Sequence, residues 1–398
     1  MKTLFGLLII ILGIGFYYLF NNKENNSDQS QGREDAAPIV KPVEKKTIKV
    51  NQSLTVDDYI TRRNFKKALD LLDKTDKNLQ NDQWKLKKVE VLDGLGQKNE
   101  ALALLDSILK NVGEGKKPEL LRLKASILEE NGFKDKSGIV LYQLVTDYPE
   151  SELTLDAALK LEKVWSSWLK DASKAQQLPQ YNKVLAYIME NSLDDASKDR
   201  VYKTLERVNA RIFFSPNKYE GLVDFHTVKY GEYLSVIAKK HKIYSERIRR
   251  INNLKNANDI RSGQNLRIIM GRTTIKVFKS TYTMHVYIQD LFFKRYRIGI
   301  GKNNQTPVVA TTISKSRAKN PTWTDPVTGR LHGPEDLKNP IGSRWIGLSM
   351  GQGYGIHGTR EPESIGFDRS NGCIRMLNQE VEELYDYSMV GDEVTIDP

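Results

Sequence analysis

The stretch IHGTREPESIGFDRSNGCIRM, from Ile356 to Met376, contains the only cysteine in a chain of 398 residues. Cys373 follows His357 by sixteen positions, and a glycine lies beside each of them. A free thiol is a weak nucleophile near pH 7, and a neighbouring imidazole can take its proton and activate it. Because Gly372 has no Cβ, backbone amides at this corner can approach a developing oxyanion closely. The pattern therefore predicts a thiol site, with Cys373 as nucleophile and His357 as general base.

Two further features bear on this site. In an extended strand Arg375 would point to the same side as Cys373, where its guanidinium could pair with a substrate carboxylate. The histidines at 332 and 357 and the cysteine at 373 do not have the spacing of a metal site. We therefore predict neither a metal nor a cofactor.

Three segments carry a resemblance to a known family. The opening stretch, together with TPVVATTISKSRAKNPTW and NPIGSRWIGL, resembles the L,D-transpeptidases with a YkuD-type catalytic domain, over residues 274–397. The resemblance implies a β-rich domain that crosslinks peptidoglycan. In this family the cysteine is acylated at the L-centre carbonyl of a diamino acid in a stem peptide, D-Ala leaves, and the acyl group passes to an amine acceptor.

The resemblance also implies roles for the loop before the cysteine. It places Ser370 and Gly372 with Cys373 at the oxyanion corner. Asn371 stands where many members have a second histidine. Asn cannot shuttle a proton at neutral pH, so Asn371 is expected to contribute only hydrogen bonds at the oxyanion or substrate-binding site. The expected activity is a peptidoglycan L,D-transpeptidase; the alternatives are an L,D-carboxypeptidase and a wall-binding scaffold without catalysis.

A second segment upstream is predicted to fold as strand, helix, helix and strand. HTVKYGEYLSVIAKKHKIYSERIRRINNLKNANDIRSGQNLRII, from His226 to Ile269, resembles a LysM domain within residues 224–270, which implies binding to peptidoglycan glycan strands. From Asp224 to Ile269 ten Lys or Arg stand against four Asp or Glu, a net charge of +6. Such a field favours a polyanion. We expect the cell wall rather than nucleic acid, with a simply solvated basic face as the alternative. We also expect this module to lie away from the chemistry, so that its removal would leave turnover of a small stem peptide nearly unchanged.

Residues 52–215 are predicted to be helical. ALDLLD at Ala68 recurs as ALALLD at Ala101, an offset of 33 residues, and both lie in helix-period apolar patterns. The repeat resembles tetratricopeptide packing. It predicts either a docking surface for a protein partner or a helical spacer.

The N-terminus decides the expected compartment. Residues 4–20 are uncharged and apolar, which predicts a transmembrane signal anchor over residues 1–23; the polar residues 24–51 are predicted to be a disordered tether. The expected location is a single-pass cell-membrane protein with its catalytic domain in the periplasm or outside the cell. The fold class is multidomain α+β: a transmembrane helix, tetratricopeptide-like helices, a small βααβ LysM domain and a β-rich catalytic domain.

Overall fold

The computed structural model describes residues 54–192, 194–325, 328–336, 338–351 and 353–398. Within these ranges every helix is too short or too polar to cross a bilayer. The transmembrane anchor and the tether predicted for residues 1–51 lie outside the described residues.

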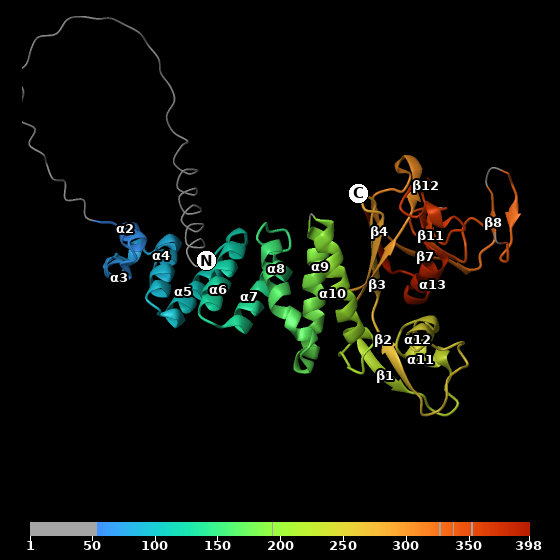
Figure 1. The fold of residues 1–398 in the computed structure, drawn as a ribbon, viewed down its shortest axis with the longest axis horizontal. Helices are drawn as coiled ribbons and strands as arrows, with labels where there is room; N and C mark the ends of the chain where they lie inside the picture. Colours follow the sequence, from blue (N-terminus) through green and yellow to red (C-terminus); the bar gives the residue numbers. More distant parts are fainter. Residues whose placement is uncertain (1–53, 193, 326–327, 337, 352) are drawn as a thin grey trace, which may run out of the picture. The chain divides into compact units, whose positions relative to one another are not determined.

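The described chain begins with helices that pack in sequence order (Figure 1). They are α2 (Val56–Thr61), α3 (Phe65–Asp73), α4 (Asp82–Gly94), α5 (Lys98–Asn111), α6 (Lys117–Glu130), α7 (Lys134–Asp147), α8 (Thr154–Trp165), α9 (Leu178–Asn191) and α10 (Asp195–Phe213). Short 3₁₀ turns lie between some of them: η1 (Lys77–Leu79), η2 (Glu114–Lys116), η3 (Ser166–Leu169) and η4 (Ala172–Gln177). The predicted helical region is therefore present.

The repeated sequence motif marks equivalent buried positions. Ala68 of α3 and Ala101 of α5 are both 0% exposed, and Leu72 and Leu105, four residues further on, are 1% and 0% exposed. A spacing of four residues places both side chains of each pair on one helical face. The repeat thus reflects the packing of two helices in the same way, whereas its tetratricopeptide character stays a prediction.

The segment that resembles LysM has the predicted element order. Strand β1 (Val223–Thr227) pairs antiparallel with β2 (Asn265–Ile269), and helices α11 (Leu234–Lys240) and α12 (Ser245–Ile251) lie between them in sequence. Leu234, Ile237 and Ile248 are buried in the small core of this module. That core also includes Met389, which comes from the β-rich domain.

The β-rich domain is built on a sheet with the strand order β13-β11-β10-β7-β14-β3-β4-β5. Its strands are β3 (Thr273–Phe278), β4 (Thr283–Ile288), β5 (Leu291–Arg297), β7 (Val309–Lys319), β10 (Arg344–Leu348), β11 (Gly355–His357), β13 (Ile374–Arg375) and β14 (Glu393–Asp397). Two smaller ladders pair β6 (Ile300–Gly301) with β12 (Asp368–Ser370), and β8 (Trp323–Thr324) with β9 (Leu331–His332). Two 3₁₀ turns, η5 (Lys302–Asn304) and η6 (Pro362–Ser364), and one helix, α13 (Asn378–Tyr387), complete the elements described in this domain.

The β4–β5 hairpin follows from its sequence. Met284, Val286 and Ile288 alternate along β4 and are at most 1% exposed. Gln289 and Asp290 both have positive φ, 49° and 62°, as a tight turn with the twist of a two-stranded hairpin requires. The alternating apolar residues and the two turn residues thus account for this hairpin.

Helices α9 and α10 cover the end of the sheet at β5. Asn182 of α9 accepts a hydrogen bond from Phe292 N and donates one to Phe292 O, both 2.9 Å long. Asn209 of α10 donates to Phe293 O (2.8 Å) and accepts from Asn182 (2.7 Å). Both asparagines are buried, and one apolar core runs from the helices into the sheet. The last two helices thus satisfy backbone groups that an edge strand would otherwise leave open.

The LysM-like module is joined to the β-rich domain by a buried arginine. Arg247 of α12 is 0% exposed. It donates hydrogen bonds to Gly271 O (2.7 Å), to Thr273 Oγ1 (2.9 Å) and to Tyr387 O at the end of α13. Burial lowers the pKa of Arg247 to about 10, so it remains charged at neutral pH.

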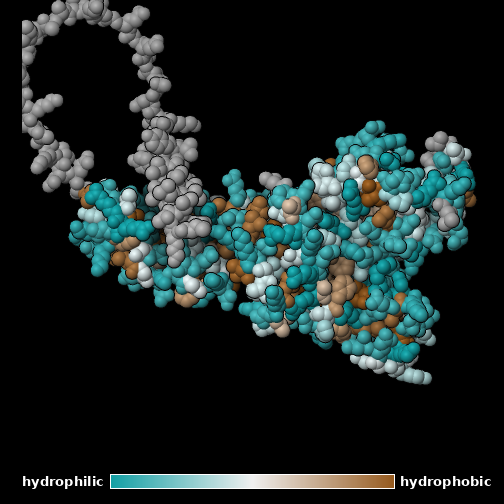
Figure 2. All heavy atoms as spheres, in the orientation of Figure 1, coloured by the Kyte–Doolittle hydropathy of each residue, from teal (hydrophilic) through white to brown (hydrophobic). Residues whose placement is uncertain are grey.

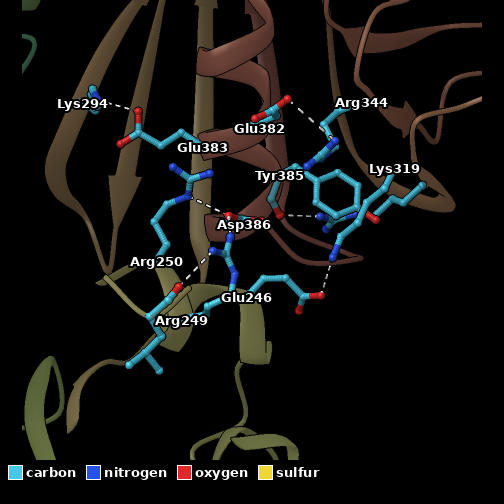
Figure 3. Close-up of polar contacts among 12 residues, drawn as sticks. Glu246, Arg249, Arg250, Lys294, Lys319, Arg344, Glu382, Glu383, Tyr385 and Asp386 are labelled. Atoms are coloured by element: carbon cyan, nitrogen blue, oxygen red, sulfur yellow. Dashed lines mark hydrogen bonds and ion pairs between the residues drawn. The ribbon is translucent and has the colours of Figure 1, made fainter. Parts of the chain in front are cut away.

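Figure 3 shows further charged contacts between α12 and the β-rich domain. Arg249 and Arg250 both reach Asp386 of α13, at 2.8 and 2.7 Å. Glu246 pairs with Lys319 of β7 at 2.9 Å. Some of the basic residues that could bind a polyanion, Arg249 and Arg250 of α12, are therefore paired within the chain and hold α12 against α13. Hydrophilic residues nevertheless cover most of the face drawn in Figure 2, and apolar residues form separate patches on it.

Candidate active site

Strand pairing brings the predicted nucleophile and base to one corner of the sheet. β11 runs parallel to β13, with Ile356 opposite Ile374 and His357 opposite Arg375. Cys373 directly precedes β13 and therefore lies beside the strand that ends in His357. The two residues are far apart in sequence, and their proximity depends on the intervening loop folding back to form this pair of strands.

The surroundings of His357 fix its tautomer. The ring is 4% exposed, and Nδ1 lies 2.5 Å from Gly358 O. A carbonyl can only accept, so Nδ1 carries the proton and Nε2 is left as the basic nitrogen. Burial lowers the pKa of His357 to about 4, against the opposing effect of the Gly358 carbonyl, and the Arg375 charge lowers it further. The imidazole is therefore neutral at pH 7.

An indole lies over this imidazole. Trp345 of β10 is the cross-strand partner of His357, and the two rings are stacked with their centroids 5.9 Å apart and their planes at 23°. Trp345 Nε1 donates to Ser316 Oγ at 3.0 Å. A Cβ on Gly355 would lie 2.6 Å from the indole, so glycine is needed there. The sequence did not reveal Trp345 as part of the site, because its position depends on strand register.

The thiol of Cys373 is held by the glycine-rich segment before β11. Sγ donates to Gly353 O at 3.1 Å. Burial raises the pKa of Cys373, and the Gly355 amide and the Arg375 charge only partly oppose this. An imidazole near the thiol therefore does not by itself produce a resting thiolate here. Desolvation dominates for both groups, and the resting pair is a neutral thiol and a neutral imidazole.

The loop before Cys373 is braced from within. Ser370 Oγ donates to Cys373 O (2.6 Å) and accepts from Gly372 N (3.2 Å). Thr306 Oγ1 donates to Gly372 O at 3.0 Å, and Gly372 has a φ of +111°, which favours glycine. The predicted oxyanion residues Ser370 and Gly372 thus already use these groups inside the loop. In the described part of the chain the amide of Cys373 has no hydrogen-bond partner, so this donor is available to an oxyanion.

The remaining predicted site residues differ in accessibility. Arg375 is not free: its Nη1 lies 3.1 Å from Glu361 Oε2, and its side chain is only 16% exposed. Asn371 is exposed, and no contact within the described residues holds its side chain. Substrate binding by Arg375 would require Glu361 to share or release it, and Asn371 faces solvent beside the thiol.

A cysteine directly before one strand and a histidine at the end of the neighbouring strand are arranged as a thiol acyl-transfer site requires. Residues 272–396 match the family model of the L,D-transpeptidase catalytic domain (YkuD), and residues 226–268 match that of the LysM domain. The YkuD protein of Bacillus licheniformis is 34% identical over 181 residues, which cover 44% of this chain and 98% of that protein. The YkuD protein of Bacillus subtilis is 32% identical over 179 residues, 43% of this chain and 97% of that protein. The chain belongs to the YkuD family of L,D-transpeptidases.

One solved structure also aligns with part of the chain. L,D-transpeptidase 3 from Mycobacterium tuberculosis, in complex with a faropenem-derived adduct, aligns with 34% of this chain and 65% of that chain, at 15% identity and a TM-score of 0.28.

Proposed function

We propose that this chain is a peptidoglycan L,D-transpeptidase that crosslinks the diamino acids of two stem peptides through an acyl-enzyme on Cys373, with release of D-Ala. The observation that carries the proposal is the position of Cys373 directly before β13, beside the strand that ends in His357, with the protonated Nδ1 of His357 turned to Gly358 and Nε2 left as a base. Membership of the family gives the reaction class; the residue roles and the leaving group are our proposal.

Acylation starts from the neutral pair. As Sγ attacks the carbonyl of the donor diamino acid, His357 Nε2 takes the thiol proton, and the oxyanion accepts a hydrogen bond from the Cys373 amide. The tetrahedral intermediate then collapses, the bond to D-Ala breaks, and the proton on Nε2 passes to the departing amine. The products are a thioester on Cys373, free D-Ala and a neutral imidazole.

Transfer repeats these steps in the opposite sense. A neutral acceptor amine attacks the thioester, His357 takes its proton, and the thiol leaves with that proton to restore the resting enzyme. Water competes at about 55 M, but a bound and oriented amine can reach effective molarities of 10⁵ M or more. This favours transpeptidation over hydrolysis wherever the acceptor is held in place.

In this proposal the other parts of the chain hold the catalytic domain at the membrane and at the cell wall. The LysM domain would bind glycan strands, and residues 1–23 would anchor the protein to the cell membrane with its catalytic domain in the periplasm or on the extracellular side. The helical region would either dock a protein partner or act as a spacer. The family's wall-directed chemistry and the apolar N-terminal sequence support this arrangement.

Mass spectrometry of the products tests the proposed reaction. A disaccharide-tetrapeptide incubated with the full chain should yield a dimer linked between two diamino acids, and an added D-amino acid should exchange into position four. Tripeptide with neither dimer nor exchange would identify an L,D-carboxypeptidase instead. No turnover of any kind would favour a wall-binding scaffold.

A further inference from the structure

The first residue of α13 contacts the segment that follows His357. The side-chain amide of Asn378 accepts a hydrogen bond from Ser343 N at 3.1 Å and donates one to Thr359 O at 3.1 Å. Ser343 directly precedes β10, and Thr359 lies in the turn after β11. One side chain thus ties the start of one strand to the turn that ends its neighbour.

Two glycines make room for this amide. A Cβ on Gly342 would lie 2.2 Å from Asn378 Oδ1, and a Cβ on Gly358 would lie 2.1 Å from it. Gly342 also has a φ of +62°, a backbone conformation that favours glycine. Gly358 does not have a positive φ, so its backbone would accept another residue. At Gly358, then, the close approach of Asn378 is what demands glycine.

Gly358 is also the residue whose carbonyl orients the catalytic base. Its oxygen accepts from His357 Nδ1 at 2.5 Å, and its amide donates to Arg344 O at 3.3 Å. The carbonyl of the following residue, Thr359, is the one that Asn378 holds. Asn378 therefore fixes the peptide next to the group that sets the tautomer and direction of the imidazole.

We propose that Asn378 is a positioning residue for His357: by clamping the Gly358–Thr359 turn, it keeps Nδ1 engaged and Nε2 directed as the base. This proposal rests on the proposed function of His357. The chemistry explains the residue type, because only a primary amide of this length offers an acceptor to Ser343 and a donor to Thr359 at once. Aspartate would keep the acceptor and lose the donor, and alanine would lose both.

Alkylation of Cys373 by iodoacetamide tests the proposal without any peptidoglycan substrate. In the intact protein His357 can take the thiol proton as the sulfur attacks. With Asn378→Ala the imidazole loses its fixed orientation, and the thiol, whose pKa burial raises, must ionise unaided. We expect the alkylation rate at pH 7 to fall at least about ten-fold and the rate profile to move to higher pH. With stem peptide, kcat should fall while KM changes little.

Asn182→Ala is the matched control. Asn182 is a more deeply buried amide whose donor and acceptor are also both used, but its partners lie on β5 and α10, away from His357. It should lower the melting temperature without changing the alkylation profile of Cys373. An unchanged profile in Asn378→Ala, or an equal loss in Asn182→Ala, would overturn the proposal. If Asn378→Ala does not fold, Asn378→Asp, which loses the donor alone, must show the same slow alkylation.

A double-mutant cycle provides a second readout. Gly358→Ala alone should also slow alkylation, because the new Cβ collides with Asn378 Oδ1. In the Asn378→Ala background that collision is absent, so adding Gly358→Ala should cost much less. Additive losses would contradict the clamp. These readouts concern thiol reactivity, so they remain interpretable even if the protein proves not to be a transpeptidase.

Discussion

At the scale of single residues, the structure changes the starting state of the reaction. Burial lowers the pKa of His357 and raises that of Cys373, so both groups are neutral at rest. A stable thiolate–imidazolium pair would react with many electrophiles before the substrate arrives, whereas a neutral pair gains its nucleophile only as the proton moves. Arg375, held on Glu361, acts on both groups through its charge.

This state predicts the acid limit of activity. His357 must be unprotonated to accept the thiol proton, and its folded-state pKa is about 4, below the ordinary value of 6.5. The rate constant kcat/KM should therefore stay high from neutral pH downward and fall only as the pH approaches about 4. Because the unfolded chain binds this proton at higher pH than the native state, stability should decline between about pH 6.5 and pH 4. A fall in kcat/KM already near pH 6.5 would show that the imidazole of His357 is not desolvated.

Substitutions at the two polar positions beside the thiol should differ in cost. His357→Ala removes the base and should slow acyl transfer at least about 10²-fold. Asn371 is exposed and held by no described contact, so Asn371→Ala should cost less than about ten-fold. Steady-state turnover of a stem tetrapeptide measures both. Equal losses would mean that Asn371 carries a proton or a substrate contact that its position does not suggest.

At the scale of elements, helix α13 contacts both the turn after His357 and helix α12 of the LysM domain. Its first residue, Asn378, contacts the turn after His357, and its last turn contacts α12 through Asp386 and the Tyr387 carbonyl. Arg247, the buried member of this second contact, looks like any arginine of the run RIRR in the sequence. Only the packing of α12 on α13 shows that it points inward.

Replacing Arg247 should therefore be costly. Arg247→Ala leaves several buried carbonyl and hydroxyl groups without a donor and opens a cavity, so we expect a loss of about 3 kcal/mol or more in unfolding free energy. Arg261→Ala, at an exposed arginine of the same module, should stay within about 0.5 kcal/mol. Chemical denaturation followed by tryptophan fluorescence compares the two. A small effect at Arg247 would mean that the two modules are not coupled through this side chain.

The sequence predicted those elements whose signal is local. The β4–β5 hairpin is evident from alternating apolar residues and its turn, and Cys373 with His357 is evident from a short glycine-flanked motif. Trp345, Thr306 and Asn378 were missed because their roles arise from contacts between segments distant in sequence, which no local pattern encodes. The directions in which the pKa values of Cys373 and His357 shift could not be read from the sequence either, because desolvation depends on the complete fold.

At the scale of the whole molecule, the described modules share buried surface. The core of the β-rich sheet continues into α6–α10, and the LysM core includes Met389 of the catalytic domain. The expectation that the LysM segment could be deleted without affecting turnover of a small peptide conflicts with this packing. Deleting residues 224–270 would expose Met389 and remove the partners of Asp386, so wall binding is better tested by substitution of exposed LysM residues than by deletion.

The central claim is that Cys373 carries the acyl group, and intact-protein mass spectrometry tests it most directly. The full chain mixed with a stem tetrapeptide and quenched in acid should gain the mass of the tripeptide acyl group. Peptide mapping should place that mass on Cys373, and Cys373→Ala should show neither adduct nor turnover. An adduct on another residue, or retained turnover in Cys373→Ala, would contradict the account.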